Sequence, residues 1–488
     1  MPRHRRHFLG PFRLPARPAL AGPVLAGLVM TCALAACQPA GPYAGPRFPF
    51  AASYAAKTGG TPVLLADTAW WTGFQDPVLD HLVTLALADN LSLAAARERV
   101  TIARADSRSL PEMASLTPTL EARARDGSAG RRDEAEASLG LSWLLDPYGL
   151  RREQLKAAWA RVEAADAEAD AARLLVLFNL CNAYVDLRYY QRLLAVRQQE
   201  LASRRQTEAL ARSLLENGRG TQFNLTRARA RVADVQRQIP TLEARVRVQM
   251  NQIAVLAGRA PGNLAGSLGV DLAKGSHGQP QSKMPPDIGI PADLLRNRPD
   301  IRISERLYYA ALADLGAARA ALMPRLSLGG AITLTSVSGG ASVRDAYFGP
   351  TLTLPALPND SRRATVDSRL AAARLAHTTW KATVLEAILE VENALLQYQA
   401  SRKARVAAER SLTLNRETQG MIAGLLTSGD ATIDDLLDAD QSVAEAAAAL
   451  TDARRQQGLD YIALNIRLGS GSRIGTTPQI QAAVAAKP

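Results

Sequence analysis

Two stretches of this 488-residue chain contain nothing that would interrupt a helix. Residues 151–217 have neither proline nor glycine, and residues 361–419 are equally free of both. Proline and glycine are the residue types that most often kink or end helices. Each stretch is therefore expected to form one helix about 100 Å long, at 1.5 Å per residue. Charged residues at every turn exclude a membrane span, so helices this long indicate a coiled coil or a repeat.

Both long stretches end in the same short motif. The pattern Gly-x-x-Thr-x-x-Asn/Asp-Leu begins at Gly218 and again at Gly429, 211 residues later (429 − 218). A glycine at the end of a helix suits the left-handed C-cap. Thr221 and Thr432 are then placed to N-cap the next helix. The motif predicts two helical hairpins with tips at 218–225 and 429–436.

The duplication extends beyond the tips. Arg151-Arg152 and Arg362-Arg363 open the long helices at the same spacing of 211, whereas Pro118 and Pro324 are 206 apart (324 − 118). The five-residue difference must lie between these markers, where a loop tolerates insertion. The chain is thus predicted to be a tandem repeat of helix, β-hairpin, long helix, tip and helix.

Residues 118–145 and 325–355 have the alternating pattern of β-hairpins. In residues 120–125, for example, leucine or alanine alternates with glutamate or arginine. Four strands of roughly 7–10 residues, apolar on one face and small or polar on the other, are typical of an outer-membrane β-barrel wall. Four strands cannot close a barrel alone, so closure requires several copies of the chain.

Composition and spacing predict the remaining boundaries. The shorter helices (78–117 with 219–257, and 292–323 with 430–467) are expected to stack end to end against the long ones, with kinks at Pro111 and Pro240. The expected organisation is a signal peptide at 1–36, a linker at 37–77, a first repeat at 78–257, a connecting segment at 258–291, a second repeat at 292–467 with its long helix at 361–428, and a tail at 468–488.

The N-terminus has the features of a lipoprotein export signal. An arginine-rich start and an apolar run lead into Leu34-Ala35-Ala36-Cys37, which matches a lipobox. An ordinary signal peptide with a chance cysteine is the alternative. We expect Cys37 to be acylated, and Gln38 in the next position favours the outer membrane over inner-membrane retention. Several acyl chains hold a protein firmly, because each buried CH₂ contributes roughly 0.8 kcal/mol.

The remaining composition argues against catalysis and nucleic-acid binding. The formal net charge of +12 falls to +7 without the five arginines of the signal peptide (12 − 5), and no basic patch with interleaved aromatics remains. The five histidines have no metal-ligand spacing, and Cys181 is left as a lone cysteine. Paired carboxylates such as Asp434/Asp435 and Asp438/Asp440 have the chemistry of acid/base groups, but they lie at a predicted helix N-terminus, where the dipole stabilises them without catalysis. We expect no cofactor and no enzymatic activity.

Several motifs together resemble the TolC superfamily of outer-membrane factors, and specifically its lipoprotein (OprM/NodT-like) branch. The resemblance covers nearly all of residues 37–470. The motifs are the lipobox, Trp70-Trp71 with Phe74-Gln-Asp-Pro77, Leu141-Ser-Trp143 with Gly149-Leu-Arg151-Arg152, Leu294-Leu-Arg-Asn-Arg-Pro-Asp-Ile301, Gly316-Ala-Ala-Arg-Ala-Ala-Leu-Met-Pro324 and the two tips.

This resemblance implies a mixed α/β-barrel fold. Three copies would form a homotrimer in which three sets of four strands make one 12-stranded outer-membrane β-barrel. The helical coiled-coil hairpins would continue it as an α-barrel in the periplasm. Such a protein is a passive exit duct for drugs or other small solutes. Its implied partners are a periplasmic adaptor protein and an inner-membrane pump of the resistance-nodulation-division type.

The resemblance also assigns roles at the tips. Asp435 and Asp438 match the aspartates that ring the periplasmic entrance, and at i and i+3 they share a helix face. Threefold repetition would place six carboxylates there, which favours cations and resists closure unless something compensates. Arg227 and Arg416 are candidates to stabilise the closed gate. The residues expected to meet the adaptor are Leu215, Gly218, Thr221, Leu225, Leu426, Gly429, Thr432 and Leu436.

Other functions remain open from the residues alone. The same fold serves type I protein secretion, although the lipobox argues mildly against it. A non-conducting periplasmic coiled-coil scaffold would explain the helices but not the strands or the lipid anchor, and a basic nucleic-acid-binding coiled coil conflicts with the export signal. Two departures from the family pattern are Pro111 inside a helix and Asp360, which stands where the first repeat has Gly149.

Overall fold

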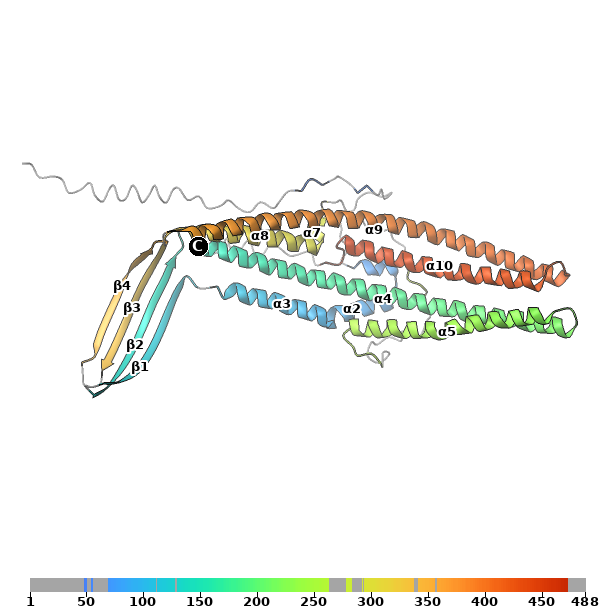
Figure 1. The fold of residues 1–488 in the computed structure, drawn as a ribbon, viewed down its shortest axis with the longest axis horizontal. Helices are drawn as coiled ribbons and strands as arrows, with labels where there is room; N and C mark the ends of the chain where they lie inside the picture. Colours follow the sequence, from blue (N-terminus) through green and yellow to red (C-terminus); the bar gives the residue numbers. More distant parts are fainter. Residues whose placement is uncertain are drawn as a thin grey trace, which may run out of the picture. The chain divides into compact units, whose positions relative to one another are not determined.

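The computed structural model describes residues 48–50, 54–55, 69–110, 112–127, 130–262, 278–282, 292, 294–337, 341–355 and 358–472. Its elements in chain order are η1 (Trp70–Phe74), α2 (Pro77–Asp89), α3 (Leu91–Arg108), β1 (Ala114–Gly127), β2 (Gly130–Leu145), α4 (Leu150–Glu216), α5 (Gln222–Leu256), α7 (Leu294–Asn297), α8 (Pro299–Ala320), β3 (Arg325–Val337), β4 (Val343–Thr353), α9 (Asp360–Ser428) and α10 (Ile433–Arg467) (Figure 1). They divide into a unit of strands and a unit of helices, described separately below.

The strand unit is one antiparallel sheet in the order β1-β2-β3-β4. Its strands have 14, 16, 13 and 11 residues, so the predicted length of 7–10 residues was too short. The ladder explains the difference, because pairing continues from Gly127↔Gly130 at the turn to Ala114↔Trp143 at the other end. The prediction of two β-hairpins and their positions is otherwise confirmed.

One face of the sheet is mostly apolar on all four strands, although Arg344 of β4 pairs with Leu334 on this face. The register aligns Leu120 with Ala137 and then with Leu334, whereas Glu121 on the opposite face aligns with Glu136 and Thr335. Large apolar side chains on the apolar face remain exposed, among them Leu116, Leu120, Leu139, Ile332, Phe348 and Leu352. Within the described chain β1 and β4 are edge strands, whose outer backbone groups can pair with further strands.

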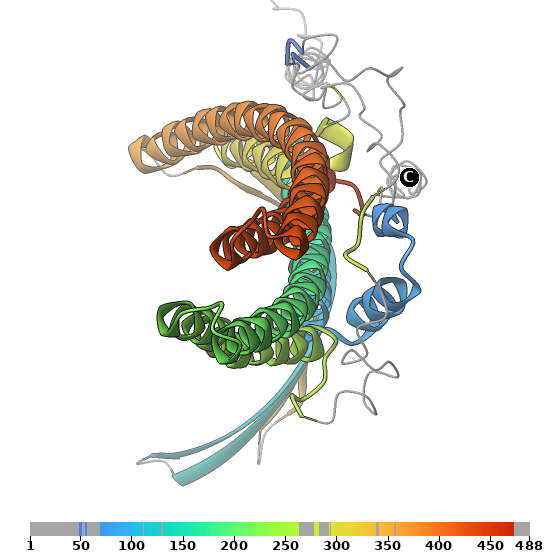
Figure 2. The ribbon, with the colours of Figure 1, turned by 90° about the vertical axis from the view of Figure 1, so that its right-hand side faces the viewer.

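The helical unit is built on α4, with 67 residues, and α9, with 69. The prediction of two uninterrupted long helices is confirmed. In the view of Figure 2, the α4–α5 and α9–α10 hairpins lie side by side. Ion pairs join shorter helices to α4, among them Arg104–Asp166 at 3.1 Å, Arg229–Glu208 at 3.5 Å and Arg302–Asp170 at 2.7 Å.

The first short helix differs from its prediction. It was expected to run from 78 to about 117, but it breaks at Asn90 and ends at Arg108. The Asn90 side chain accepts a hydrogen bond from Leu93 N at 3.1 Å, which N-caps α3, and donates one to Leu256 O at 2.8 Å. The break therefore lets α3 meet the end of α5, as the end-to-end stacking predicted. Pro111 lies outside the described residues, and α5 continues across Pro240.

The second repeat forms the same kind of junction. The equivalent break separates α7 from α8, and the C-terminal end of α10 reaches it through Gly469. Gly258 and Gly469, 211 residues apart (469 − 258), both have positive φ, at 72° and 78°. A Cβ at Gly258 would lie 2.3 Å from Asp89 O, and one at Gly469 2.6 Å from Asn297 O. Glycine at both positions allows the backbones to approach this closely.

The second junction contains a largely buried charged side chain, Arg298. Its guanidinium donates to Asp300 Oδ2 at 2.6 Å, to Glu390 Oε2 at 2.7 Å and to Arg467 O at 2.9 Å. Burial alone would lower the pKa of Arg298, but the hydrogen bonds and charges of Asp300 and Glu390 raise it above its ordinary value. Three helices, α8, α9 and α10, therefore meet at one charged side chain.

The main apolar core lies where α2, η1 and the C-terminal part of α10 pack on the middle of α4 and α9. Pro77 begins α2 with Asp76 as its N-cap, as predicted. Asp76 also accepts a 2.6 Å hydrogen bond from the Tyr184 hydroxyl. The core includes Trp70, Leu79, Leu82, Leu177, Leu180, Cys181, Tyr184, Trp380, Val384 and Tyr461. Cys181 is thus a packing residue, and burial raises the pKa of its thiol.

The stretch Pro77–Arg108 is, by length and composition only, apolar enough to cross a membrane. Asn90 breaks this stretch, and Leu79, Leu82 and Ala86 are fully buried in the protein core, whereas Leu91 and Ile102 are exposed.

The two strand-to-helix turns differ, as the departure at Asp360 suggested. Gly149 precedes α4 with a φ of 74°, whereas Asp360 is the first residue of α9 and follows Asn359 at a φ of −100°. The first turn needs the left-handed conformation that glycine adopts readily, and the second does not.

Candidate functional site at the hairpin tips

Both tips have the caps that the repeated motif predicts. Gly218 and Gly429 adopt φ values of 69° and 87°, in the left-handed region. The Thr221 hydroxyl accepts from Asn224 N at 3.2 Å, and the Thr432 hydroxyl accepts from Asp435 N at 3.3 Å. Each tip is therefore a sharp turn between two helices, fixed by its own backbone and cap.

Asp435 completes a capping box at the second tip. Its Oδ2 accepts from Thr432 N at 2.8 Å and lies 2.6 Å from the Thr432 hydroxyl. These two hydrogen bonds, from the hydroxyl first and the backbone second, hold the pKa of Asp435 below its ordinary value. The carboxylate is thus kept ionised and directed back along its own turn, although it is exposed.

Arg227 on α5 joins the first hairpin to the second. Its guanidinium lies 3.0 Å from Asp434 Oδ1 and 3.5 Å from Asp438 Oδ1, both in the first turns of α10. The Asp434 contact brings the charges together without hydrogen-bond alignment, since Asp434 Oδ1 has no hydrogen-bond partner. Asp438 keeps 67% of its side chain exposed, so each pair contributes at most about 1 kcal/mol. We call these contacts the surface latch.

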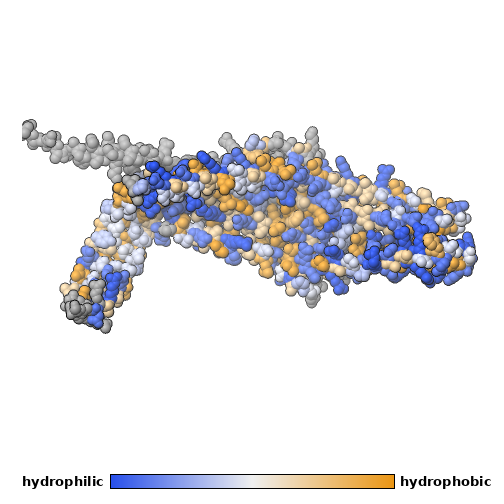
Figure 3. All heavy atoms as spheres, in the orientation of Figure 1, coloured by the Kyte–Doolittle hydropathy of each residue, from blue (hydrophilic) through white to orange (hydrophobic). Residues whose placement is uncertain are grey.

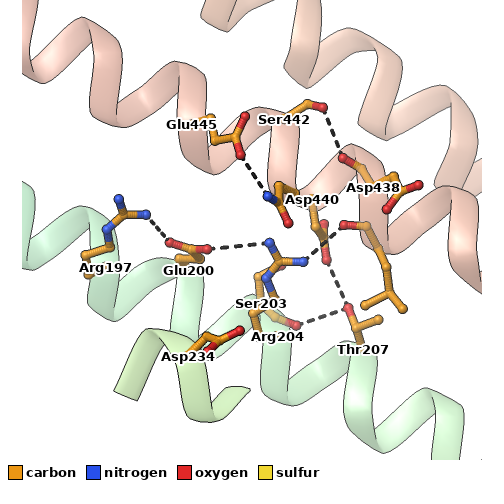
Figure 4. A network of polar contacts seen from close by, with 12 residues as sticks. Arg197, Glu200, Ser203, Arg204, Thr207, Asp234, Asp438, Asp440, Ser442 and Glu445 are labelled. Atoms are coloured by element: carbon orange, nitrogen blue, oxygen red, sulfur yellow. Dashed lines mark hydrogen bonds and ion pairs between the residues drawn. The ribbon is translucent and has the colours of Figure 1, made fainter. Parts of the chain in front are cut away.

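Figure 4 shows a buried polar cluster in which Arg204 and Thr207 of α4 face Asp440 of α10. Thr207 Oγ1 of α4 lies 3.0 Å from Asp440 Oδ2 of α10, and Gln419 Nε2 of α9 donates to Asp440 Oδ1 at 2.5 Å. Arg204, one α4 turn before Thr207, donates to Leu437 O of α10 at 3.1 Å. We call Arg204, Thr207, Gln419 and Asp440 the buried bolt.

The charges of the buried bolt are well shielded from water. Arg204 is 3% exposed and Asp440 6% exposed, and both oxygens of Asp440 have hydrogen-bond partners. Arg204 also contacts Glu200 at 3.5 Å. Because Glu200 lies on the same helix as Arg204, the bolt joins α4 to α10 through two hydrogen bonds, Arg204 to Leu437 O and Thr207 to Asp440. Both are shielded from water, whereas the ion pairs of the surface latch are exposed.

The predicted site residues differ in their contacts and burial in the structure. It brings Arg227 together with Asp438, but Arg416 is exposed and forms no ion pair among the residues described. Asp435 and Asp438 do not contact one another. Leu225 is buried with Ala211, Ala228 and Ile433, whereas Leu215, Leu426 and Leu436 are only half-buried. Cys37 lies outside the described residues.

The two tips have opposite charge. Residues 217–233 contain four arginines and no carboxylate, and residues 425–441 contain five aspartates and no basic residue. Hydrophilic side chains predominate at the tip end of the helical unit on the face seen in Figure 3. The described part of the chain holds no group of three or more His, Cys, Asp or Glu arranged to bind a metal. The carboxylates of the second tip are engaged in a cap, ion pairs and hydrogen bonds.

Long capped hairpins with a separate four-stranded antiparallel sheet define the class of channel-forming outer-membrane proteins, and comparison with known proteins agrees. A family described as "Outer membrane efflux protein" matches residues 82–259 and 290–470. Nodulation protein T of Rhizobium leguminosarum bv. trifolii is 35% identical over 454 residues, 90% of this chain and 95% of the relative. Outer membrane protein OprJ of Pseudomonas aeruginosa is 29% identical over 472 residues, 92% of this chain and 95% of that protein.

Solved structures show the same fold. The outer-membrane channel OprN superposes with a TM-score of 0.76 and 29% identity, covering 88% of this chain and 99% of that one. The open state of the MtrE channel of Neisseria gonorrhoeae has a TM-score of 0.78 at 24% identity, with 89% and 98% covered, and shows the fold alone.

The chain belongs to the outer membrane efflux protein family, within the TolC superfamily. It is an efflux channel of the Gram-negative outer membrane that extends into the periplasm.

Proposed function

We propose that three copies of this chain form the exit duct of a tripartite efflux system. The duct conducts drugs or other small solutes passively from a periplasmic adaptor and an inner-membrane pump of the resistance-nodulation-division type. Closure by copies of the same chain follows from the sheet, which has two edge strands and cannot close alone. Three copies of four strands give 12, an even number within the range of such barrels.

The observation that carries this proposal is the exposed apolar face of the sheet. Leu120 is 82% exposed and Phe348 67% exposed, on the same face as Leu116 and Leu352. A soluble protein rarely exposes a continuous apolar face, whereas a barrel wall presents one to lipid. A coiled-coil scaffold would have no use for it.

The entrance to the duct lies at the tips in this proposal. Asp435 and Asp438 of three copies ring the opening and favour cations. The surface latch offsets the repulsion between these carboxylates, because the positive charge of Arg227 lies against Asp434 and Asp438. Arg416 has no such contact within the described chain, so the gate-stabilising role passes to Arg227. Opening then requires that Arg227 lose its partners.

The tips themselves are the docking surface for the adaptor. The residues assigned to it are Leu215, Gly218, Thr221, Leu225, Leu426, Gly429, Thr432 and Leu436. The capped turns make both tips rigid, which limits the entropy lost on docking. Acylation at Cys37 anchors the chain to the outer membrane beside the barrel.

Mass and conductance of the purified full-length protein in detergent and in planar bilayers test the proposal. We expect a trimer with a small, cation-selective conductance, which represents a duct closed at its entrance. A monomer that never conducts would contradict the duct and favour a scaffold.

A further inference from the structure

Five ring-bearing side chains join the N-terminal segment to α8 and α9. Phe48 lies edge-on to Trp380 of α9, with ring centroids 6.1 Å apart, and packs on Phe50 at 5.0 Å. Trp380 stacks on His377 at 6.0 Å, and His377 lies 5.0 Å from Tyr308 of α8. Trp380 is fully buried. We call Trp380, His377 and Tyr308 the seat of Phe48.

A second contact fastens the same segment farther along α9. Ala55 N donates to Glu392 Oε1 at 2.6 Å, and Tyr54 belongs to the main apolar core. We call the described residues 48–50 and 54–55 the strap. Its two contacts lie 12 residues apart on α9 (392 − 380), or about 18 Å, and seven apart on the strap (55 − 48). The strap therefore runs in the same direction as α9, and its first residue is the end nearer to the N-terminus of that helix.

The N-terminal end of the strap is directed toward the membrane in the proposed duct. α9 begins at Asp360, seven residues after β4 ends at Thr353 (360 − 353). Because the strands occupy the outer membrane in that proposal, the N-terminal end of α9 lies at its inner surface. Trp380 is 20 residues farther along the helix (380 − 360), or about 30 Å. A lipid-bearing N-terminus must span about this distance to reach the membrane.

The chain ahead of the strap is only slightly longer than that distance. Eleven residue steps separate Cys37 from Phe48 (48 − 37). A fully extended chain covers at most about 3.3–3.6 Å per residue, so these steps reach at most about 36–40 Å. The surplus over the distance from Trp380 to the start of α9 is therefore only about 6–10 Å.

We propose that the strap limits the reach of the lipid anchor, so that the acyl chains of Cys37 enter the inner leaflet beside the N-terminal end of α9. This inference rests on the proposed acylation and the proposed duct. The surface that the anchor binds is the hydrocarbon of the inner leaflet, at one depth relative to Trp380. A much longer tether would also hold the chain in the membrane, but it would leave this position undetermined.

Shortening the tether tests the limit. Deletion of residues 40–44 keeps Gln38 and leaves six steps (11 − 5), which reach at most about 20–22 Å and fall short of the start of α9. Anchoring by several acyl chains is firm, so Phe48 should leave its seat before the lipid leaves the membrane. The matched control replaces residues 40–44 by Gly-Ser-Gly-Ser-Gly and keeps the length of the tether.

Chymotrypsin reports whether the strap is seated, because it cleaves after accessible aromatic residues. Phe50 is partly buried and Tyr54 buried against the main core, so the wild type should resist. In outer-membrane fragments, we expect cleavage after these residues to be about tenfold faster in the deletion protein than in the wild type or the Gly/Ser control. Mass spectrometry measures the cleavage, and fatty-acid labelling shows whether each protein is acylated.

The decisive variant removes the lipid from the shortened chain. An ordinary cleavable signal peptide replaces residues 1–36, and Cys37→Ser removes the acylation site. We expect this deletion protein to be as resistant as the wild type. Resistance of the acylated deletion protein would overturn the inference, because the tether would then have length to spare. Rapid cleavage with and without the lipid would also overturn it, since shortening alone would then unseat the strap.

Phe48→Ala tests the seat without changing the length of the tether. Loss of the ring should speed cleavage after Tyr54 whether or not the protein is acylated, and an unchanged rate would contradict the seat. Other results separate this inference from the proposals beneath it. A wild type without fatty-acid label would contradict the proposed acylation, and a monomer that never conducts would contradict the proposed duct.

Discussion

Arg227 on α5 and Asp438 on α10 occupy the same position in the two repeats, 211 residues apart, and form an ion pair with one another. This relationship makes Arg227 the residue whose loss should loosen the entrance. Arg227→Ala should raise single-channel conductance several-fold while lowering the free energy of unfolding by no more than about 2 kcal/mol, because it removes two exposed ion pairs, to Asp434 and Asp438.

The control for Arg227→Ala is Arg416→Ala. Arg416 is exposed and without an ion pair in the described residues, so its removal should leave both conductance and melting temperature unchanged. Equal conductance of the wild type and Arg227→Ala in planar bilayers would refute the latch.

Asp435 gives the second tip a defined pH dependence. Hydrogen bonds from Thr432 lower its folded pKa below the ordinary 3.8. A lowered folded pKa means that its stabilising effect is present above pH 3.8 and disappears as pH falls through the lower, folded value. Amides in the first turn of α10 should therefore stay protected from hydrogen exchange down to pH 3.8 and lose protection below it. Asp435→Asn should weaken this protection above pH 3.8, and disappearance of the protection above pH 3.8 in the wild type would contradict the expectation.

The two helix junctions should differ sharply in their response to mutation. Arg298 is 9% exposed and contacts Asp300 and Glu390, so Arg298→Met should destabilise the protein by about 3–5 kcal/mol. Arg259 pairs with Asp89 at the first junction with both side chains 39% exposed, so Arg259→Met should cost less than about 1 kcal/mol. Thermal unfolding of the two variants compares their stabilities directly. Similar losses of stability would show that the burial of Arg298 does not determine the effect of its substitution.

Two glycines with the same backbone conformation should differ in the stability lost on substitution by alanine, because the space around them differs. Gly429 has a φ of 87° and open space for a Cβ, so Gly429→Ala should cost only the roughly 1–2 kcal/mol of a left-handed alanine. Gly469 has a φ of 78°, and its Cβ would lie 2.6 Å from Asn297 O. Gly469→Ala should therefore lower the melting temperature clearly more than Gly429→Ala does. Equal decreases in melting temperature would mean that the C-terminal end of α10 can move away from Asn297 without loss of stability.

Most of the helical architecture could be predicted from the chain itself. Gly218, Gly429, Thr221 and Thr432 cap helices through local backbone geometry, which sequence spacing records directly. The break at Asn90 was missed because its cause is not local. The Asn90 amide bonds to Leu256, 166 residues away, and only the folded junction shows that contact.

Only part of the candidate site could be predicted from the sequence, because its other contacts join residues that are far apart in the chain. Arg227 was a candidate only by its position near the first tip, and its partner proved to be its own repeat equivalent. Arg204 and Thr207 gave no signal, since they lie in a long helix with many similar residues and reach α10 across 233 positions. A buried aspartate such as Asp440 cannot be told from an exposed cap residue by spacing along a helix.

The central claim is that tip carboxylates form the entrance to a conducting duct. The most direct test is the reversal potential of purified trimers under a salt gradient, compared between the wild type and Asp435→Asn with Asp438→Asn. The account predicts a cation-selective wild type, and a variant with weaker selectivity and higher conductance. An unchanged reversal potential and conductance in the variant would contradict it.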